Sequence, residues 1–595
     1  MSVQSITTRA RLTASATGMA GRNFMRRLMR SRLMRWRYRG PAINQLILVP
    51  QDLRTSDPSF SSELHHGQCG LAGIAAYIGQ ESPFVVRPPS PEWERDLHGF
   101  GWLRNLTAAG EQIARDQARA LVAEWIALNR SMSGASWQPE LVARRVISWI
   151  SHSSLLLQGA DTDYYDRVME SLTEQLRYLH AHWRDTAEGT DRLTALVALQ
   201  LAGLAAAEMQ PLLDECARPF NDQLRRQVLP DGGHVSRNPA ILIEILLDLL
   251  PLKQCYISRN LTPPAELTSA IDRMMPMIRF FRMGDGALAR FNGCGPTATD
   301  MLATVIAYDD SVKAPDELAE ASGYCRLAQG HSIVIADVGS PPPPANSGAA
   351  HAGCLSFELS WGASPIVVNC GSPAHRDMEW SRVMRSTLAH STLSLGHESS
   401  GQFLAARLDR SASADARLVG PTKVAASISR VEAGISLSAS HDGYESRYGV
   451  VHHRRLTLSD EGRLLEGEDK LLAPSGLRGE ARLGNGAFQI HFHLHPDVEP
   501  RPQPDGKSAL LVLRDGTAWM LTTDSGAVGM DQSAYLAVDR GPRRSWQALI
   551  GGQFAPGTRE AKVNWSLMQV AGEYEWTAAA VSEAQPPAME EPAST

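Results

Sequence analysis

The sequence predicts a protein of two halves, an all-helical half followed by an antiparallel β-sandwich. Between Thr107 and Met283 apolar residues recur every three or four positions, which is the spacing of helices that bury one face. After about residue 325 short alternating runs of apolar and polar residues replace that pattern, separated by Gly, Pro, Asp and Ser at strand-plus-turn spacing. A chain of 595 residues is long enough to bury a core in each half.

The helical half is expected to be a stack of antiparallel neighbours. Its connections are short and carry helix breakers such as Pro139, Gly159, Gly189 and Pro211. Helices joined by short connections lie side by side and run in opposite directions. In chain order, the clearest periodic segments are EQIARDQARALVAEWIALN, ELVARRVISWISHSSLLLQ, YYDRVMESLTEQLRYLHAHW, RLTALVALQLAGLAAAE and AELTSAIDRMMPMIRFFRM.

The second half is expected to contain many short strands. The prolines at 341–344 lie between two of these strands, and we expect a loop there because proline donates no hydrogen bond to a strand ladder. The Gly-rich segment 285–310 separates the two halves, where a ligand cleft is the default expectation. The predicted strands include HSIVIADVG, CLSFELS, PIVVNCG, STLSLG, RRLTLS, FQIHFHLH, SALLVLR and AWMLTT.

We predict four segments along the chain. Residues 1–45 form a basic tail, 46–310 a helical domain, 311–575 the sandwich domain and 576–595 a polar, Pro-rich tail that we expect to be disordered. The first 51 residues carry ten arginines and no acidic residue. Three interpretations of the basic tail stay open: a mobile tail, a targeting segment, or a segment that contacts an anionic membrane surface. We expect no nucleic-acid partner.

The sequence predicts neither a membrane span nor a secretory signal peptide. Polar or acidic residues such as Gln200, Glu244 and Asp248 interrupt the longest apolar runs before they reach the about 18–20 residues that a span needs. No apolar stretch follows the arginines. We therefore expect a cytoplasmic protein, or one that reaches the cell envelope or periplasm by a non-standard route. The seven cysteines form no C-x-x-C pair, which favours reduced, buried thiols.

One candidate site lies in PDGGHVSRNP, residues 230–239, directly before an apolar helix. Arg237 and Asn238 at a helix N-terminus can hold a carboxylate or a sulfate. His234 beside them is the first candidate for a general base, because imidazole titrates near neutral pH. The alternative for Asn238 is that it only caps the helix whose first residue is Pro239.

Further candidates lie near the junction of the halves. Arg282, Arg290 and Asn292 in FFRMGDGALARFNGCG are expected to bind an anionic group of a substrate, and His397 in HESSGQF is expected to reach the same cleft. The alternative is that these charged residues are solvated or salt-bridged. The three histidines of HFHLH, residues 491–495, lie on one face of a strand, where they either chelate a metal or form a polar face of the sandwich.

Several motifs together resemble the heparinase II/III-like polysaccharide lyases, in a bacterial branch of that family. The resemblance covers most of the chain. The motifs are HAGCLSFELSWGASPIVVNCG at 351–371, RSTLAHSTLSLG at 385–396, PPSPEWERDLHGFGWLRNL near the start, DGGHVSRNP in the helical half, and HDGYESRYGVVHHRRLTLSDEGRLLEGEDKL with FHLHPDV in the sandwich.

The resemblance implies an incomplete α/α toroid followed by the sandwich, and an enzyme. The implied activity is that of a carbon–oxygen lyase, which cleaves an acidic, uronate-containing polysaccharide such as a heparin-like or alginate-like glycan by β-elimination. It further implies one structural zinc ion, with His351, Asn369 and His390 at the ligand positions, where Asn369 replaces the aspartate of the family pattern. No organic cofactor is expected.

Four positions that bear on proton transfer depart from the family pattern. Thr190 and Asp191 stand where an Asn-His pair is expected, Ile241 where a tyrosine is expected, and Ala349 where the first histidine of the strand motif is expected. Two functions therefore stay open. The first is a lyase in which His234, Arg237 and Asn238 carry the catalysis. The second is a catalytically degenerate protein of the same fold, which binds glycans or takes part in assembling the cell envelope.

Overall fold

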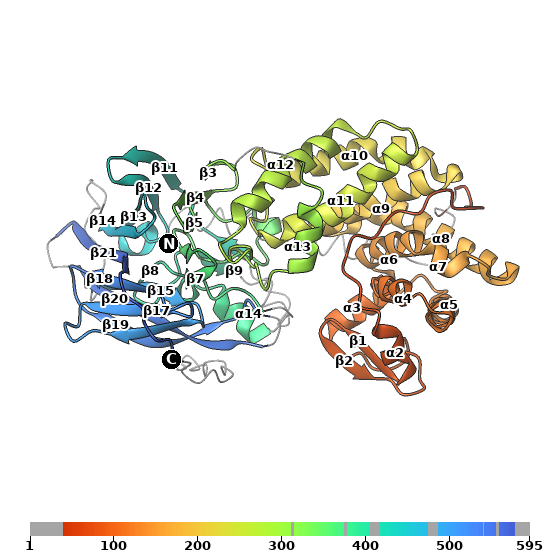
Figure 1. Cartoon of the computed structure of the whole chain (residues 1–595). Helices are drawn as coiled ribbons and strands as arrows, with labels where there is room; N and C mark the ends of the chain where they lie inside the picture. Colours follow the sequence, from red (N-terminus) through yellow and green to blue (C-terminus); the bar gives the residue numbers. More distant parts are fainter. Residues whose placement is uncertain are drawn as a thin grey trace, which may run out of the picture. The chain divides into compact units, whose positions relative to one another are not determined.

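The fold is described from a computed structural model (Figure 1). The described residues form two compact units. Unit 1 comprises those up to Gln223 together with Asp248–Pro264, and unit 2 comprises Leu224–Leu247 and the chain from Ala265 onwards. The predicted boundary between the helical domain and the sandwich domain, at residue 310, differs from this division. Unit 2 also includes helical segments that precede residue 310. The structure describes residues 38, 40–310, 315–373, 378–404, 417–473, 486–538, 541–554 and 558–577.

Unit 1 is built mainly of helices, as predicted. Two long helices, α10 (Pro211–Gln227) and α11 (Ala240–Ser258), each run from one unit into the other. The remaining elements are α2 (Phe60–His65), β1 (Gln68–Leu71), β2 (Ile74–Tyr77), α3 (Pro91–Gly99), α4 (Leu103–Ala109), α5 (Gln112–Leu128), α6 (Pro139–Ser151), α7 (Ser153–Leu157), α8 (Thr162–His182) and α9 (Thr190–Ala205).

The core of unit 1 surrounds α6, which packs against α3, α8 and α9. Aromatic rings fill this core: the ring of Phe100 lies 4.9 Å from that of Trp102 and 5.5 Å from that of Trp149. The tryptophans of the helical half are buried, as expected for large aromatic residues at helical spacing. Local sequence sets the helix starts, since Ser90 accepts a hydrogen bond from the N–H of Trp93 at 3.1 Å and caps α3.

Unit 2 contains helices α12 (Ala265–Phe281), α13 (Thr299–Ile306), α14 (Met378–Met384) and α15 (Glu445–Tyr448), together with two large antiparallel sheets. One sheet has the order β11 (Val424–Val431), β12 (Gly434–His441), β13 (Val451–Ser459), β14 (Leu464–Leu472), β21 (Glu560–Val570), β18 (Ala518–Thr523), β17 (Ser508–Leu513), β16 (Val498–Pro502). The other has the order β19 (Val528–Tyr535), β20 (Arg543–Gln553), β15 (Ala487–Leu494), β7 (Ser364–Val368), β6 (Phe357–Trp361), β5 (Ser332–Asp337), β4 (Tyr324–Gln329), β3 (Leu318–Ala319), with β8 (Leu393–Leu395) also paired to β15. A small separate pair joins β9 (Gln402–Leu404) and β10 (Arg417–Val419).

The two sheets bury one common apolar core, so the predicted antiparallel sandwich is confirmed. Alternate residues of each strand face this core: Phe488, Ile490 and Phe492 of β15 are fully buried, and Leu456 and Leu458 of β13 face them from the other sheet. The Pro-rich stretch 341–344 lies between β5 and β6 outside the strands, as predicted.

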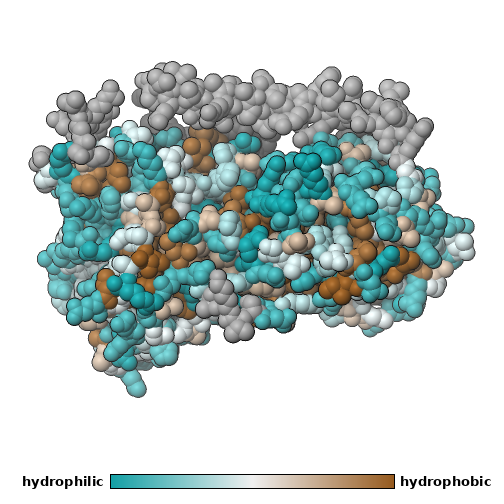
Figure 2. All heavy atoms as spheres, turned by 90° about the horizontal axis from the view of Figure 1, so that it is seen from above, coloured by the Kyte–Doolittle hydropathy of each residue, from teal (hydrophilic) through white to brown (hydrophobic). Residues whose placement is uncertain are grey.

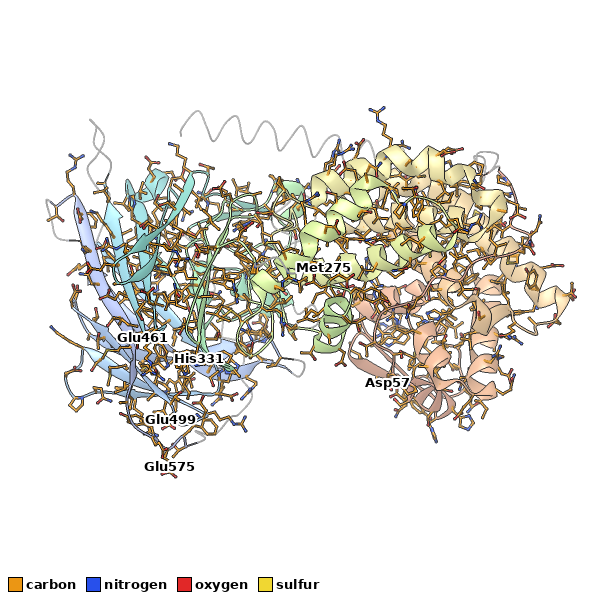
Figure 3. All side chains as sticks on the ribbon, turned by 45° about the horizontal axis from the view of Figure 1, so that its top comes forward. Asp57, Met275, His331, Glu461, Glu499 and Glu575 are labelled. Atoms are coloured by element: carbon orange, nitrogen blue, oxygen red, sulfur yellow. The ribbon has the colours of Figure 1, made fainter. Side chains whose placement is uncertain are left out.

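The last described residues lie against β16 (Figure 3). Glu499 accepts a hydrogen bond from Arg501 at 2.9 Å and another from the N–H of Thr577 at 2.7 Å, and Arg501 also contacts the main-chain carbonyl of Glu575. Thr577, in the segment predicted to be a disordered tail, thus contacts Glu499 of β16, and the disorder of that segment stays a prediction. The rest of that predicted tail, and residues 1–37 of the basic tail, lie outside the described residues.

Apolar side chains on the surface are few and scattered. On the face shown in Figure 2, hydrophilic residues predominate and apolar ones lie in small separate groups. Within the described ranges, the structure contains no helix with the length and apolarity that a membrane crossing requires.

We expect Gly467→Ala to destabilise the sandwich. Gly467 of β14 lies opposite Trp565 of β21, and an added Cβ atom would stand 2.0 Å from the indole ring. Overpacking of this kind costs about 1–3 kcal/mol of the free energy of unfolding, which urea denaturation measures. The matched control is Gly551→Ala in β20, where the added atom meets nothing within 4 Å. Equal stabilities of the two variants would contradict this account of the packing.

Candidate functional site

His234 lies in the turn that leads into α11 and is buried, with 3% of its surface exposed. Its Nδ1 accepts a hydrogen bond from the N–H of Ser236 at 3.2 Å, so the ring proton lies on Nε2, which faces Oε1 of Gln227 at 3.3 Å. Burial lowers the pKa of His234 to about 4, and the ring is neutral at pH 7. Both ring nitrogens therefore already have partners within the protein.

Arg237 lies in the same turn and is also buried. A guanidinium group has five N–H donors, and all five have acceptors here. Asp337 accepts at 2.6 Å, and this carboxylate holds the pKa of Arg237 above its usual range although burial opposes the charge. The other acceptors are the main-chain carbonyl groups of Ser322 (2.7 Å), Gly323 (2.8 Å), Gly339 (3.1 Å) and Ser340 (3.0 Å). No donor of Arg237 is left for the carboxylate of a sugar.

Asn238 caps α11. Its Oδ1 accepts a hydrogen bond from the N–H of Ala240 at 3.0 Å, which satisfies one of the free donors at the helix start. Pro239 follows it, a residue without an N–H group to satisfy. The capping alternative for Asn238 is confirmed, while catalytic roles of His234, Arg237 and Asn238 stay predictions.

Asn292 joins the ion pair of Arg237. Its Nδ2 donates to Oδ2 of Asp337 at 3.1 Å and to the hydroxyl of Tyr324 at 2.7 Å. Its Oδ1 accepts the N–H of His351 at 3.2 Å. Asn292 is 2% exposed, so its amide is used to connect the turn of Arg237 to the sandwich.

Arg290 lies in a second buried network. Its guanidinium pairs with Glu358 at 3.2 Å and with Asp285 at 3.4 Å, and only 5% of the side chain is exposed. Of the other predicted substrate-binding residues, His397 is exposed at the tip of a turn with a φ of 60°. The buried Nε of Arg282 has no hydrogen-bond partner among the described residues.

His351 and His390 face each other. Nδ1 of His351 lies 3.0 Å from Nε2 of His390, and both rings are buried. His390 donates from Nδ1 to the carbonyl of Ser386 at 2.7 Å, which leaves Nε2 with a lone pair. His351 donates to that lone pair, and its own Nε2 accepts from Ser372 at 3.2 Å. Burial lowers the pKa of His390 to about 4 and that of His351 well below its usual range.

The third residue of the implied zinc set is used elsewhere. Asn369 donates from its main-chain N–H to Glu358 at 2.9 Å, and its Oδ1 accepts the N–H of Ser391 at 3.0 Å. No group of three or more His, Cys, Asp or Glu side chains gathers as a metal site within the described parts of the chain. Two neutral imidazoles suit zinc, but the amide of Asn369 supplies no charge, and the N–H of Ser391 already occupies one lone pair of its Oδ1. The residues therefore do not fit the implied three-ligand site.

Two acids outside the predicted site residues hold these networks together. Asp337 binds both Arg237 and Asn292, and Glu358 binds both Arg290 and Asn369. Glu358 had a visible signal, because it is a charged residue in the middle of the apolar run CLSFELS. A fully buried carboxylate within a strand needs a cationic partner.

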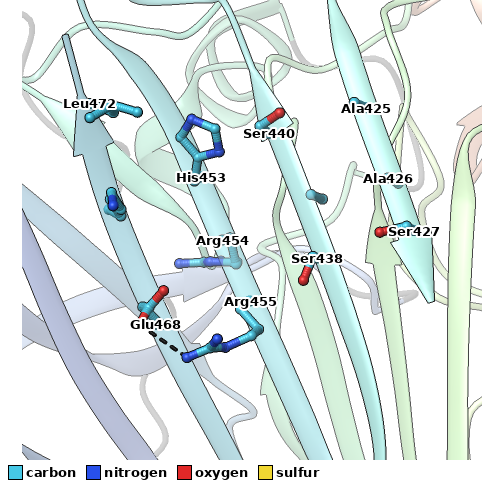
Figure 4. A pocket seen from close by; sticks show the side chains of 12 residues that line it. Ala425, Ala426, Ser427, Ser438, Ser440, His453, Arg454, Arg455, Glu468 and Leu472 are labelled. Carbon is cyan, nitrogen blue, oxygen red and sulfur yellow. Dashed lines mark hydrogen bonds and ion pairs between the residues drawn. The ribbon is translucent and has the colours of Figure 1, made fainter. Parts of the chain in front are cut away.

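A separate hollow of about 470 Å³ lies on the outer face of β11–β14 (Figure 4). Ser427, Ser438 and Ser440 form part of its floor. The charged residues at its edge are already paired, Arg455 with Glu468 at 3.1 Å and Lys470 with Glu560 at 2.8 Å. This hollow is distinct in sequence from the predicted site residues and includes none of them.

Comparison with known proteins identifies the family. The family described as "Heparinase II/III-like, C-terminal" matches residues 312–571. The chain is also 33% identical over 534 residues to FtsZ-localized protein C of Caulobacter vibrioides, which covers 88% of this chain and 90% of the relative. The chain belongs to the heparinase II/III-like family. The resemblance seen in the sequence motifs is thereby confirmed.

Solved structures of this family share the fold. Heparinase III matches with a TM-score of 0.70 at 14% identity, covering 91% of this chain and 89% of that one. A heparan sulfate lyase mutant from Pedobacter heparinus matches with a TM-score of 0.63 at 15% identity, covering 89% and 87%. At these identities the likeness concerns the fold, and the chemistry has to be argued from the side chains.

We expect the stability of this heparinase II/III-like protein to fall as the pH falls from about 6.5 to about 4. Histidines in an unfolded chain titrate near pH 6.5. Burial lowers the pKa of His234 and His390 to about 4 and that of His493 to about 3, so the unfolded state takes up more protons in this range. Each such histidine lowers the free energy of unfolding by about 1.4 kcal/mol for each pH unit that the pH falls. Urea denaturation at several pH values measures this change. Unchanged stability between pH 7 and pH 5 would contradict this.

We expect the purified protein to contain well below one equivalent of zinc by elemental analysis, and its melting temperature to be unchanged by a chelator. The reason is that Asn369 is bonded to Glu358 and Ser391. His390→Ala is expected to lower stability to the same extent with and without the chelator. One tightly held equivalent of zinc, lost in His390→Ala, would instead support the zinc site implied by the resemblance.

Proposed function

We propose that this chain is a non-catalytic member of the heparinase II/III-like family and that it acts in the cell where FtsZ assembles. The observation that carries the proposal is the similarity to FtsZ-localized protein C, which extends over 88% of this chain and 90% of that protein. An alignment of that extent includes both the helical half and the sandwich, so the two proteins share their whole architecture rather than one common domain.

The geometry of the predicted catalytic residues supports the absence of lyase chemistry. β-Elimination needs a base within reach of the sugar and donors that stabilise the developing negative charge. His234 is buried with partners on both ring nitrogens, and Arg237 uses all of its donors within the protein. Ile241 and Ala349, at two positions where the family pattern has a proton-transferring residue, carry no titratable group.

A second candidate is a lyase that acts on an acidic, uronate-containing glycan. One observation favours it: the guanidinium of Arg282 forms no ion pair among the described residues, and its buried Nε has no partner there. An unpaired arginine of this kind suits the carboxylate of a uronate. His234 is then the base, and an opening of its turn has to release it from Gln227 and Ser236 before catalysis.

Two assays on the purified full-length chain distinguish the candidates. We expect the protein to pellet with FtsZ polymers in a sedimentation assay and to remain in the supernatant without them. We expect no gain in the absorbance of unsaturated uronate during incubation with a panel of uronate-containing glycans.

Failure to pellet with FtsZ polymers would contradict the proposed action where FtsZ assembles. A gain in the absorbance of unsaturated uronate would contradict the proposed absence of catalysis. In the latter case His234→Ala is expected to lower turnover by about 100-fold, the usual scale for loss of a general base. His66→Ala, an exposed histidine beside α2, is the matched control and is expected to leave turnover unchanged. Full turnover by His234→Ala would place the base elsewhere.

A further inference from the structure

A second hollow, of about 450 Å³, lies in unit 2, and none of the predicted site residues lines it, although Cys370 and Ala389 in its lining adjoin Asn369 and His390 in sequence. Helix α14 and the short turn after it form one side, and β15, β19 and β20 form the other. Its volume falls in the range of pockets that hold small molecules, about 300–1,000 Å³. The sheet presents its outer surface here, because Phe492 and Leu494 point into the sandwich core whereas His493 between them lines the hollow.

The floor of this hollow is polar but uncharged. His493 is 3% exposed, and its Nε2 donates to the carbonyl of Leu388 at 2.9 Å, which leaves the lone pair on Nδ1. The hydroxyl of Ser533 lies 2.8 Å from Nδ1 and the thiol of Cys370 lies 3.4 Å from it. Burial lowers the pKa of His493 to about 3, so its ring is neutral at pH 7.

The wall formed by α14 is apolar. Trp380 and Met384 line the hollow and are each 5% exposed, so most of their surface packs within the protein. Val383 and Ala389 complete this wall. An indole ring and a thioether beside an open space provide a contact surface for another apolar group.

The rim carries a cation, Arg544, that no carboxylate of the described residues neutralises. Arg544 lines the hollow, is exposed, and has no carboxylate partner among the described residues. Its neighbour Arg543 differs in this respect, because it pairs with Asp497 at 3.3 Å. The amide groups of Gln532 and Gln547 lie in the same lining and add hydrogen-bonding capacity.

We propose that this hollow binds a small molecule with an apolar ring or chain and a single carboxylate, which Arg544 holds at the rim while the apolar part lies against Trp380 and Met384. A guanidinium group binds a carboxylate through two parallel hydrogen bonds. The neutral floor formed by His493, Ser533 and Cys370 accepts a polar atom but offers no partner to a second charge, and burial of an unpaired charge is costly. The site therefore selects a monoanion.

Isothermal titration of the full-length chain tests this with three related probes. The probes are 1-naphthylacetate, its neutral analogue 1-naphthylacetamide, and naphthalene-1,8-dicarboxylate, which carries a second charge. We expect 1-naphthylacetate to bind about tenfold more tightly than the amide, the scale of a charge-assisted hydrogen bond, and the dicarboxylate to bind more weakly than the monoanion.

Two matched variants locate the carboxylate. Arg544→Gln is expected to abolish the difference between 1-naphthylacetate and the amide, and because Arg544 is exposed the fold is expected to be retained. Arg543→Gln removes the same charge from the adjacent position and is expected to preserve the tenfold difference. The proposal is overturned if 1-naphthylacetate does not bind at millimolar concentration, if it binds no better than the amide, or if both variants lose the preference equally.

Discussion

The buried ion pair between Arg237 and Asp337, at 2.6 Å, is the interaction on which the arrangement of the candidate site depends. Asp337 ends a strand of the sandwich, and Arg237 lies in the turn before α11, so the pair joins segments that are far apart in sequence. Asn292 attaches to the same carboxylate and in turn accepts the N–H of His351. Removing either charge would leave the other buried and unpaired, which costs about 3–5 kcal/mol. This ion pair therefore stabilises the turn that contains Arg237.

The same requirement for satisfied buried groups explains the exchange at position 369. The side-chain amide of Asn369 donates from Nδ2 to Glu358 at 3.5 Å, and its Oδ1 accepts the N–H of Ser391 at 3.0 Å. An ionised aspartate accepts only, and it would place a second carboxylate beside Glu358, whose pKa burial already raises. An amide suits this hydrogen-bond network better than a carboxylate does. The network that fits asparagine here is also the reason that the metal-ligand set remains incomplete.

A shared architecture does not require a shared chemistry in this family. The similarity to heparinase III extends over 91% of this chain, although only 14% of the aligned residues are identical. Apolar cores tolerate extensive substitution when volume and pattern are kept, whereas a catalytic centre does not tolerate the loss of a single proton-transferring group. A protein can therefore retain the toroid-and-sandwich architecture after its function has changed, and the side chains at each site have to be assessed separately.

The sequence by itself determined the helical half, the antiparallel sandwich, the Pro-rich loop between β5 and β6 and the cap at Asn238. These features follow from the order of apolar, polar and turn-forming residues over a few positions. Only the tertiary structure decided what Arg237, Arg290 and His351 do. Their partners lie 100, 68 and 39 residues away along the chain, respectively. A polar side chain can bind a ligand only if packing does not bring a partner from a distant part of the chain beside it. A local sequence pattern does not specify such partners.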